Sequence, residues 1–412
     1  MFDKIKNIKK DELVRGGIIL FLMMNIANFL NYIFQFSMAR LLGPVDYGIF
    51  AVLMALLYIF LIPSETVQTI LAKYTSKFNV KKKLGKISEL LKRSMKNGLI
   101  FSAAAFLILI PVAFFLSGFL NISLPLIIIT NLFVILAFTS PIVRGILQGM
   151  KRFRELGINI FIESFIKIVA GILLVLFSWK VYGGVAGIIL GGVVSLILAY
   201  YILKKTLPKK SKEEKFKGIY SYSLPIFVVM ISIVLMYSLD IILARRFFSP
   251  EIAGKYAVAA IMGKIILFAT FSIGKAMFPI ATEKHESGKS SLSIFRKAFT
   301  ITLLISLSAL LIYFFFPKLV VSLLFGQAYL EVYNILFLVG LAYTFLTLAN
   351  IIILYGISAN KIKNSAFFSF IPVILQIALL SIFNSNLFMF SLALVFSNIA
   401  MLIYSIIVVV KK

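Results

Sequence analysis

The residues that could bind a polar ligand are amides and charges placed inside long apolar runs. In the run 16–39, four amides fall within roughly 120° of arc at 100° per residue, and these are Asn25, Asn28, Asn31 and Gln35. The run 47–72 carries Glu65 and Gln68 just after Pro63, where a proline would free a backbone carbonyl. Polar groups inside apolar spans are costly. We therefore expect these side chains to line a polar cavity or to hydrogen-bond between helices.

Charged residues occur in later apolar runs. The run 219–244 carries Asp240, and the run 252–282 carries Lys264 and Lys275. Three helical turns separate the two lysines, so they share one helix face about 16 Å apart. We expect both to bind an anionic ligand, with Lys264 near mid-run and Lys275 extending toward an end. Asp240 either neutralises Lys264 or the neighbouring Arg245, or it serves with Glu65 as an ion-coupling carboxylate.

Glu163 and Lys167 are four residues apart in the run 157–178, a spacing that predicts an ion pair between them. Other chemistry is excluded by what the sequence lacks. There is no cysteine and one histidine, which removes thiolate and multi-histidine metal sites. No glycine-rich phosphate loop is present, and no long loop carries the acid and base residues of a glycosyl-transfer enzyme. The sequence predicts no enzyme, no cofactor and no metal.

The elements that position these residues are apolar segments. Of 412 residues, 61% are hydrophobic and 14% are charged, whereas soluble domains are near half apolar and a quarter charged. Each membrane crossing needs about 20 apolar residues. The sequence therefore predicts an all-α polytopic membrane protein with about twelve spans, at 16–39, 47–72, 98–118, 122–143, 157–178, 182–203, 219–244, 252–282, 298–316, 329–355, 364–383 and 387–410.

The net charge of +27 comes from basic residues in the predicted loops, and this distribution does not indicate a nucleic-acid-binding surface. Most of the 42 Lys and Arg residues lie in alternate loops and at both termini, so the positive-inside rule predicts cytoplasmic termini in a multi-pass protein of the cell membrane. We expect no cleavable signal peptide, because residues 1–17 are charged and a full-length span follows. The segment 80–98 has the amphipathic spacing of an interfacial helix. The other loops hold only six basic residues, namely Arg40, Lys180, Arg245, Arg246, Lys255 and Lys318.

Two polar interruptions of the apolar chain match each other. Shifted by 206 residues, "ARLLGPVDYGIF" aligns with part of "ARRFFSPEIAGKYAV". A Gly or Ser cap followed by Pro favours a helix start, so each interruption predicts a tight outer turn, with Arg40 and Arg246 at an outer gate. The offset predicts a parallel internal repeat, a plan typical of two-lobed transporters. The aligned pairs include Arg40 with Arg246, Pro44 with Pro250, and Gly48 with Gly254.

The repeat predicts three regions. Residues 1–203 form an N-terminal six-helix lobe and residues 218–412 form a C-terminal six-helix lobe. Residues 204–217 form a basic cytoplasmic linker, because this stretch has no apolar face.

With further stretches, these motifs resemble the Wzx-type polysaccharide-repeat flippases of the MOP superfamily, which also holds lipid II flippases and MATE drug exporters. The other matching stretches are "RGILQGMKRFRELGINIFIESFIKI", "DIILARRFFSPEIAGKYAVA" and "LLFGQAYLEVYNILFLV". The resemblance implies two six-helix lobes around a central cavity lined by the first, second, seventh and eighth spans. It also implies a lipid-linked oligosaccharide that is moved from the cytoplasmic to the outer leaflet by alternating access.

Such a protein would have its glycan substrate, membrane lipids, a coupling ion (H⁺ or Na⁺) and glycan-assembly proteins as partners, and no nucleic acid. Two alternatives stay open. A MATE-like cation or drug antiporter would use Glu65 or Asp240 as its proton or sodium site. A membrane enzyme such as a glycan polymerase would need an outer domain with acid and base residues.

Overall fold

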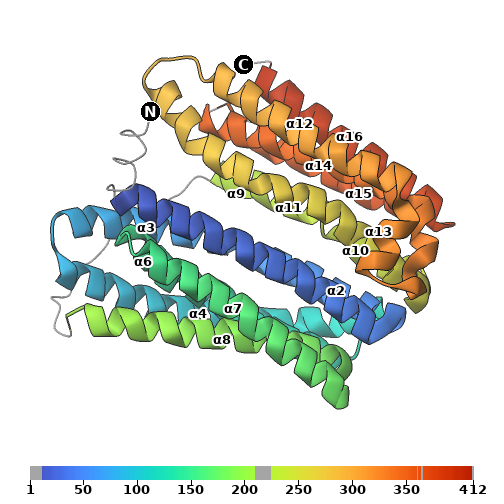
Figure 1. Cartoon of the computed structure of the whole chain (residues 1–412), viewed down its shortest axis with the longest axis horizontal. Helices are drawn as coiled ribbons and strands as arrows, with labels where there is room; N and C mark the ends of the chain where they lie inside the picture. Colours follow the sequence, from blue (N-terminus) through green and yellow to red (C-terminus); the bar gives the residue numbers. More distant parts are fainter. Residues whose placement is uncertain (1–11, 209–223, 360, 363–364, 411–412) are drawn as a thin grey trace. The chain divides into compact units, whose positions relative to one another are not determined.

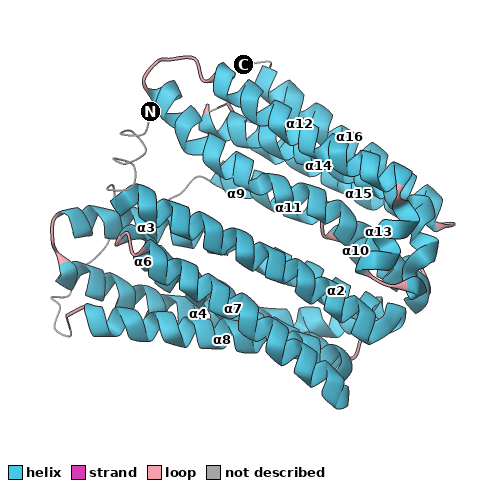
Figure 2. Ribbon diagram, in the orientation of Figure 1, coloured by secondary structure: helices cyan, strands magenta, loops and turns pink. Residues whose placement is uncertain are grey.

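The computed structural model describes residues 12–208, 224–359, 361–362 and 365–410. Every regular element in these ranges is a helix (Figures 1 and 2), which confirms the predicted all-α class. The helices before the linker are α2 (Glu12–Phe60), α3 (Ile62–Val80), α4 (Leu84–Leu120), α5 (Leu124–Asn131), α6 (Phe133–Gly149), α7 (Phe153–Leu174), η1 (Val175–Trp179) and α8 (Lys180–Thr206). Those after it are α9 (Leu224–Met236), α10 (Leu239–Phe247), α11 (Pro250–Glu286), α12 (Leu292–Phe315), α13 (Pro317–Leu324), η2 (Gln327–Val332), α14 (Tyr333–Ser358), η3 (Ala366–Ser369), α15 (Phe370–Ile382) and α16 (Leu387–Val410).

The chain divides into two compact units, and the division passes through α2. Unit one comprises Met1–Leu42 and Phe60–Tyr222, and unit two comprises Gly43–Ile59 and Ser223–Lys412. At Gly43 the backbone has φ 71° and ψ 174°, which interrupts the helix. Glycine adopts a positive φ without the steric cost that a Cβ would bring. The predicted boundaries at residues 203 and 218 stay predictions, because residues 209–223 lie outside the described chain.

The second interruption has the predicted helix start. Ser249 is the N-cap of α11, and its side-chain oxygen accepts a hydrogen bond from the Ile252 amide at 3.4 Å. Pro250 occupies the first turn, where no amide hydrogen is needed, and Glu251 follows it, where the helix dipole favours an acidic side chain. In the first copy, the non-helical backbone at Gly43 makes α2 two helices that meet at a kink, and Pro44 begins the second of them.

Nine helical stretches of the described chain are long and apolar enough to cross a membrane. Two of them, Leu22–Val80 and Phe153–Thr206, have 59 and 54 residues, which suffices for two crossings each at about 20 residues per crossing. Ala366–Ile382 is apolar but shorter. The total of twelve spans stays a prediction.

The basic segment 80–98 is not a separate interfacial helix, so that prediction is wrong. Helix α4 begins at Leu84 and continues without a break to Leu120. The apolar positions that gave the segment its amphipathic spacing include Ile87, Leu90 and Leu91, which are buried in a core cluster of unit one. The apolar face therefore packs on protein.

Helix α8 packs against α7 through glycines spaced four residues apart. A Cβ added at Gly187 would lie 2.6 Å from the Gly171 nitrogen, and one added at Gly191 would lie 2.6 Å from the Glu163 carbonyl oxygen. Small residues at this spacing let two helix backbones approach closely. The backbone of α7 around Glu163 and Lys167 thus packs directly against α8.

In unit two, the two copies of the repeat lie against each other. A Cβ at Gly48 of α2 would lie 2.9 Å from the Gly254 Cα of α11 and 3.3 Å from the Pro250 carbonyl oxygen. In return, a Cβ at Gly254 would collide with the Pro44 carbonyl. The contact is reciprocal between equivalent positions, so backbone meets backbone at a crossing that admits only glycine.

Candidate functional site

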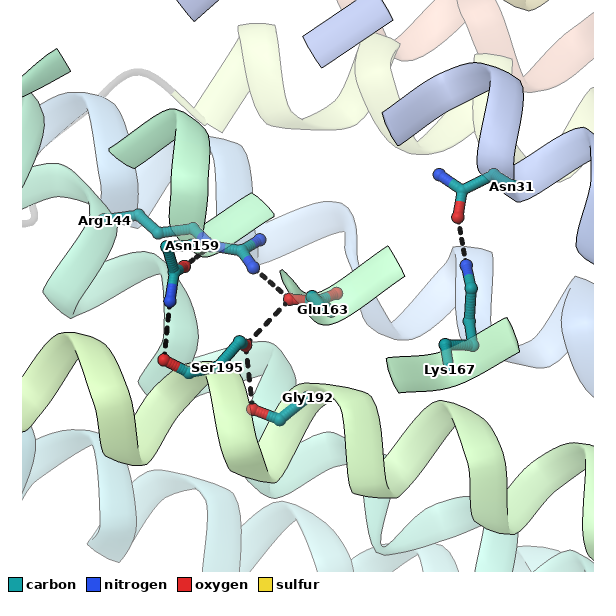
Figure 3. Close-up of polar contacts among 7 residues, drawn as sticks. All are labelled: Asn31, Arg144, Asn159, Glu163, Lys167, Gly192 and Ser195. Atoms are coloured by element: carbon teal, nitrogen blue, oxygen red, sulfur yellow. Dashed lines mark hydrogen bonds and ion pairs between the residues drawn. The ribbon is translucent and has the colours of Figure 1, made fainter. Parts of the chain in front are cut away.

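Unit one contains a polar network built on one carboxylate, Glu163 of α7 (Figure 3). Its Oε2 atom accepts hydrogen bonds from the Arg144 guanidinium of α6 and, at 3.0 Å, from the Ser195 hydroxyl of α8. Asn159 completes the network, since its Oδ1 accepts from Arg144 Nε at 3.0 Å and its Nδ2 donates to the Ser195 carbonyl at 2.6 Å. The Arg144 and Glu163 side chains are 19% and 30% exposed. The half-buried ion pair and its hydrogen bonds therefore link α6, α7 and α8.

Lys167 does not bind Glu163, so the predicted ion pair within α7 is wrong. Its ammonium donates to the Asn31 side-chain oxygen of α2 and lies 5.2 Å from the centre of the Phe34 ring. Glu163 instead forms its ion pair with Arg144 of the neighbouring helix α6.

The other predicted amides of unit one differ in exposure. Asn25 and Asn28 are exposed, Asn31 is half-buried and Gln35 is 6% exposed. Gln68 of α3 donates to Gln148 of α6 at 3.0 Å. The predicted amide arc therefore changes along α2 from an open surface to the packed core. The Glu65 side chain lies outside the described residues, so its role as an ion site stays a prediction.

Unit two contains a second cluster, centred on Asp240 of α10. Asp240 is completely buried, and its Oδ2 accepts hydrogen bonds from Tyr343 of α14 at 2.9 Å and Tyr256 of α11 at 3.1 Å. Lys264 of α11 is 1% exposed and interacts with the Asp240 charge. Its ammonium lies 5.6 Å from the Tyr58 ring and 5.9 Å from the Tyr237 ring. Tyr58 and Lys264 are also partners at the repeat offset of 206 residues.

Two atoms of this second cluster lack hydrogen-bond partners in the described chain, namely Asp240 Oδ1 and Lys264 Nζ. Buried polar atoms are almost always satisfied. The interaction with Asp240 agrees with the expectation that this carboxylate neutralises Lys264. Because Lys264 is sealed from solvent here, a ligand would reach it only after side chains around it move.

The remaining predicted site residues lie on the surface. Lys275, Arg40 and Arg246 are exposed, whereas the adjacent Arg245 is 7% exposed. Their roles in ligand binding and in an outer gate stay predictions. No group of three or more His, Cys, Asp or Glu side chains suited to a metal occurs among the residues that the structure describes.

Sequence reasoning missed several members of both clusters. Arg144 lies between the predicted spans 122–143 and 157–178, and its separation from Asn159 and Glu163 matches no helical spacing that would identify it as their partner. Tyr256 and Tyr343 belong to 17 tyrosines, and nothing in the chain singles out the two whose hydroxyls reach Asp240.

Known proteins and families match parts of this chain. The model of a family described as "Polysaccharide biosynthesis protein" matches residues 13–285. An uncharacterised membrane protein of Methanocaldococcus jannaschii, MJ1068, is 26% identical over 176 residues. That match covers 40% of this chain and 35% of the relative, so it spans about a third of the relative's length.

Solved structures similar to the chain belong to the MOP superfamily. An inward-facing MATE multidrug transporter has a TM-score of 0.74 at 13% identity, covering 94% of this chain and 96% of its own. The lipid II flippase MurJ has a TM-score of 0.71 at 15% identity, covering 96% and 88%. A MOP transporter from Pyrococcus furiosus, described as having a binding pocket of reversed polarity, has a TM-score of 0.66 at 15% identity, covering 96% and 93%. These similarities establish the MOP fold of a multi-pass membrane protein.

Proposed function

Because the chain belongs to the polysaccharide biosynthesis protein family, we propose that it is a flippase for lipid-linked oligosaccharides. It moves a glycan carried on a polyprenyl phosphate or diphosphate from the cytoplasmic to the outer leaflet of the cell membrane, with both termini in the cytoplasm. The family and the MOP neighbours are proteins of transport rather than catalysis, which supports a role in moving the glycan and not in making it.

The observation that carries the proposal is the presence of amide and charged side chains inside helices apolar enough to cross a membrane. Such residues are expensive in lipid, and they mark substrate and ion pathways. A sugar offers hydroxyls, which both donate and accept hydrogen bonds, as the exposed amides Asn25 and Asn28 do. A phosphate offers negative charge to cations such as Lys264.

Ion coupling is a further part of the proposal. Asp240 is a buried carboxylate with one oxygen lacking a hydrogen-bond partner in the described chain. In an alternating-access cycle, rearrangement around Lys264 would change the charge that Asp240 faces, so the carboxylate would exchange H⁺ or Na⁺ as the substrate moves. Glu65 is the second candidate for this role.

The test is reconstitution of the purified chain into vesicles with a fluorescent polyprenyl-diphosphate-linked oligosaccharide. A membrane-impermeant quencher should reach all of the labelled lipid when the protein is present and only the outer leaflet when it is absent. Lys264→Met and Asp240→Asn should both slow flipping, while Lys318→Gln, at an exposed lysine outside the cluster, should flip at the wild-type rate.

The same vesicles separate the proposal from its alternative. Ion-driven efflux of a cationic dye without movement of the lipid-linked glycan would identify an antiporter and reject the flippase. Normal flipping by Lys264→Met would keep the flippase and remove Lys264 from its site.

A further inference from the structure

The polar side chains of α6 and α7 in unit one carry more positive than negative charge. The three ionisable ones are Arg144 and Glu163 of the network and Lys167, which lies beside it. The Glu163 carboxylate binds the Arg144 guanidinium and the Ser195 hydroxyl, both through Oε2. Lys167 interacts with Glu163 electrostatically, yet its direct contacts are an amide oxygen and an aromatic ring. Neither contact carries a negative charge, so the ammonium has no anion bound to it in the described chain.

Lys167 is also within reach of a ligand. Its side chain and that of Asn31 are half-buried, and Asn28, three residues earlier on α2, is exposed. Lys264 of unit two is 1% exposed by comparison. An ammonium at the edge of a polar, partly open patch can bind a ligand without first breaking a packed core.

The position of Lys167 is fixed by its surroundings. A Cβ added at Gly191 of α8 would lie 3.1 Å from the Lys167 Cβ and backbone nitrogen, so α8 backs directly onto this residue. On the other side, the Phe34 ring occupies the space in front of Gly171, where an added Cβ would lie 2.6 Å from the ring. A charge held by rigid helices loses little entropy when a ligand binds.

We propose that Lys167, together with the amides of Asn31 and Asn28, forms a subsite for the phosphate or diphosphate group of the transported lipid; this inference rests on the proposed function. An ammonium has three hydrogens, and Asn31 takes one of them, which leaves donors for phosphoryl oxygens. The Asn31 amide accepts from Lys167 through oxygen, so its nitrogen stays available as a donor. The Arg144–Glu163 pair is structural and holds α6 and α7 in place beside the subsite.

The test measures binding by the full chain in nanodiscs, with a polyprenyl diphosphate and inorganic diphosphate as separate probes. Lys167→Gln should weaken binding of the lipid by about tenfold or more, the effect of losing a charged hydrogen bond. Lys167→Arg, which keeps the charge, should restore most of the affinity. Lys318→Gln is the matched control, because Lys318 also lies over an aromatic ring, at 4.6 Å from the Tyr333 centre, but outside this network.

A second substitution separates anion binding from a merely structural role. Glu163→Gln removes the negative charge next to the subsite, so it should leave affinity unchanged or raise it, with a steeper dependence on salt. If Lys167→Gln and Glu163→Gln weaken binding equally, the network only supports the fold and the inference is wrong. Elution as a monodisperse species checks that each variant has folded.

Further outcomes distinguish this inference from the proposed function. Wild-type binding and flipping by Lys167→Gln would overturn the subsite and leave the flippase intact. If the wild type binds inorganic diphosphate as tightly as the lipid but flips no glycan, the subsite recognises free phosphate and the flippase is wrong. Binding of neither probe by the wild type would reject both.

Discussion

The crossing of Gly48 and Gly254 yields a prediction with a magnitude. In Gly254→Ala the new methyl would meet the Pro44 carbonyl, with the Pro44 carbonyl carbon at 2.6 Å. These are backbone atoms, which cannot rotate away as a side chain would, so the α2 segment must shift. Overpacking of this kind costs about 1–3 kcal/mol, and the helix propensity of alanine returns about 1 kcal/mol. We therefore expect the free energy of unfolding to fall by up to about 2 kcal/mol.

The matched control is Gly118→Ala in α4, where an added Cβ has no neighbour within 4 Å in the described chain. This variant should be unchanged or more stable by up to about 1 kcal/mol. Equilibrium unfolding in mixed micelles measures the free energy of unfolding of both variants. Gly48→Ala should lose about as much stability as Gly254→Ala. If Gly254→Ala is as stable as Gly118→Ala, the two helices are not in backbone contact and the crossing described above is wrong.

Three further predictions concern the charges. Glu163→Ala strands the Arg144 guanidinium and should cost about 1–3 kcal/mol of unfolding free energy, less than a fully buried pair because both side chains are partly exposed; adding Arg144→Met should recover part of the loss, and simple additivity in the double-mutant cycle would contradict the pairing. Asp240→Asn and Lys264→Met should each lower the thermal unfolding temperature, and the double variant should unfold above the lower of the two, since no buried charge is left alone. Lys255→Met should cost no more than about 1 kcal/mol in the same unfolding assay, because the Glu251 and Glu331 partners of Lys255 are exposed; a larger loss would mean that this surface pair is shielded from water.

The sequence was sufficient for the helical class, because apolar length and period are properties of each segment by itself. The pairing of charges was not available in this way. Glu163 has Lys167 four residues away and Arg144 nineteen residues away, so spacing favoured the lysine. The structure chooses Arg144 because α6 and α7 pack side by side, and this depends on tertiary contacts that no local pattern records.

Helices in this chain extend past the ends of the predicted apolar spans. The predicted span 122–143 stops before Arg144, since a charge normally ends an apolar run. Helix α6 continues to Gly149 and includes Arg144, whose guanidinium is paired with Glu163. The segment 80–98 was separated from its span by the same reasoning, whereas α4 runs through both. A charged residue in the sequence indicates that its side chain must contact water or an oppositely charged partner. It does not by itself indicate that the helix ends there.

The division of α2 affects how the chain is made. Gly48 leaves the ribosome 206 residues before Gly254, a delay of about 10–40 s at ordinary rates of synthesis. Throughout that interval the glycine face of Gly43–Ile59 has no partner, and small residues are the surface by which foreign helices associate in lipid. A chain truncated before α11 would therefore keep this glycine face unpaired in the bilayer, where it could associate with other helices.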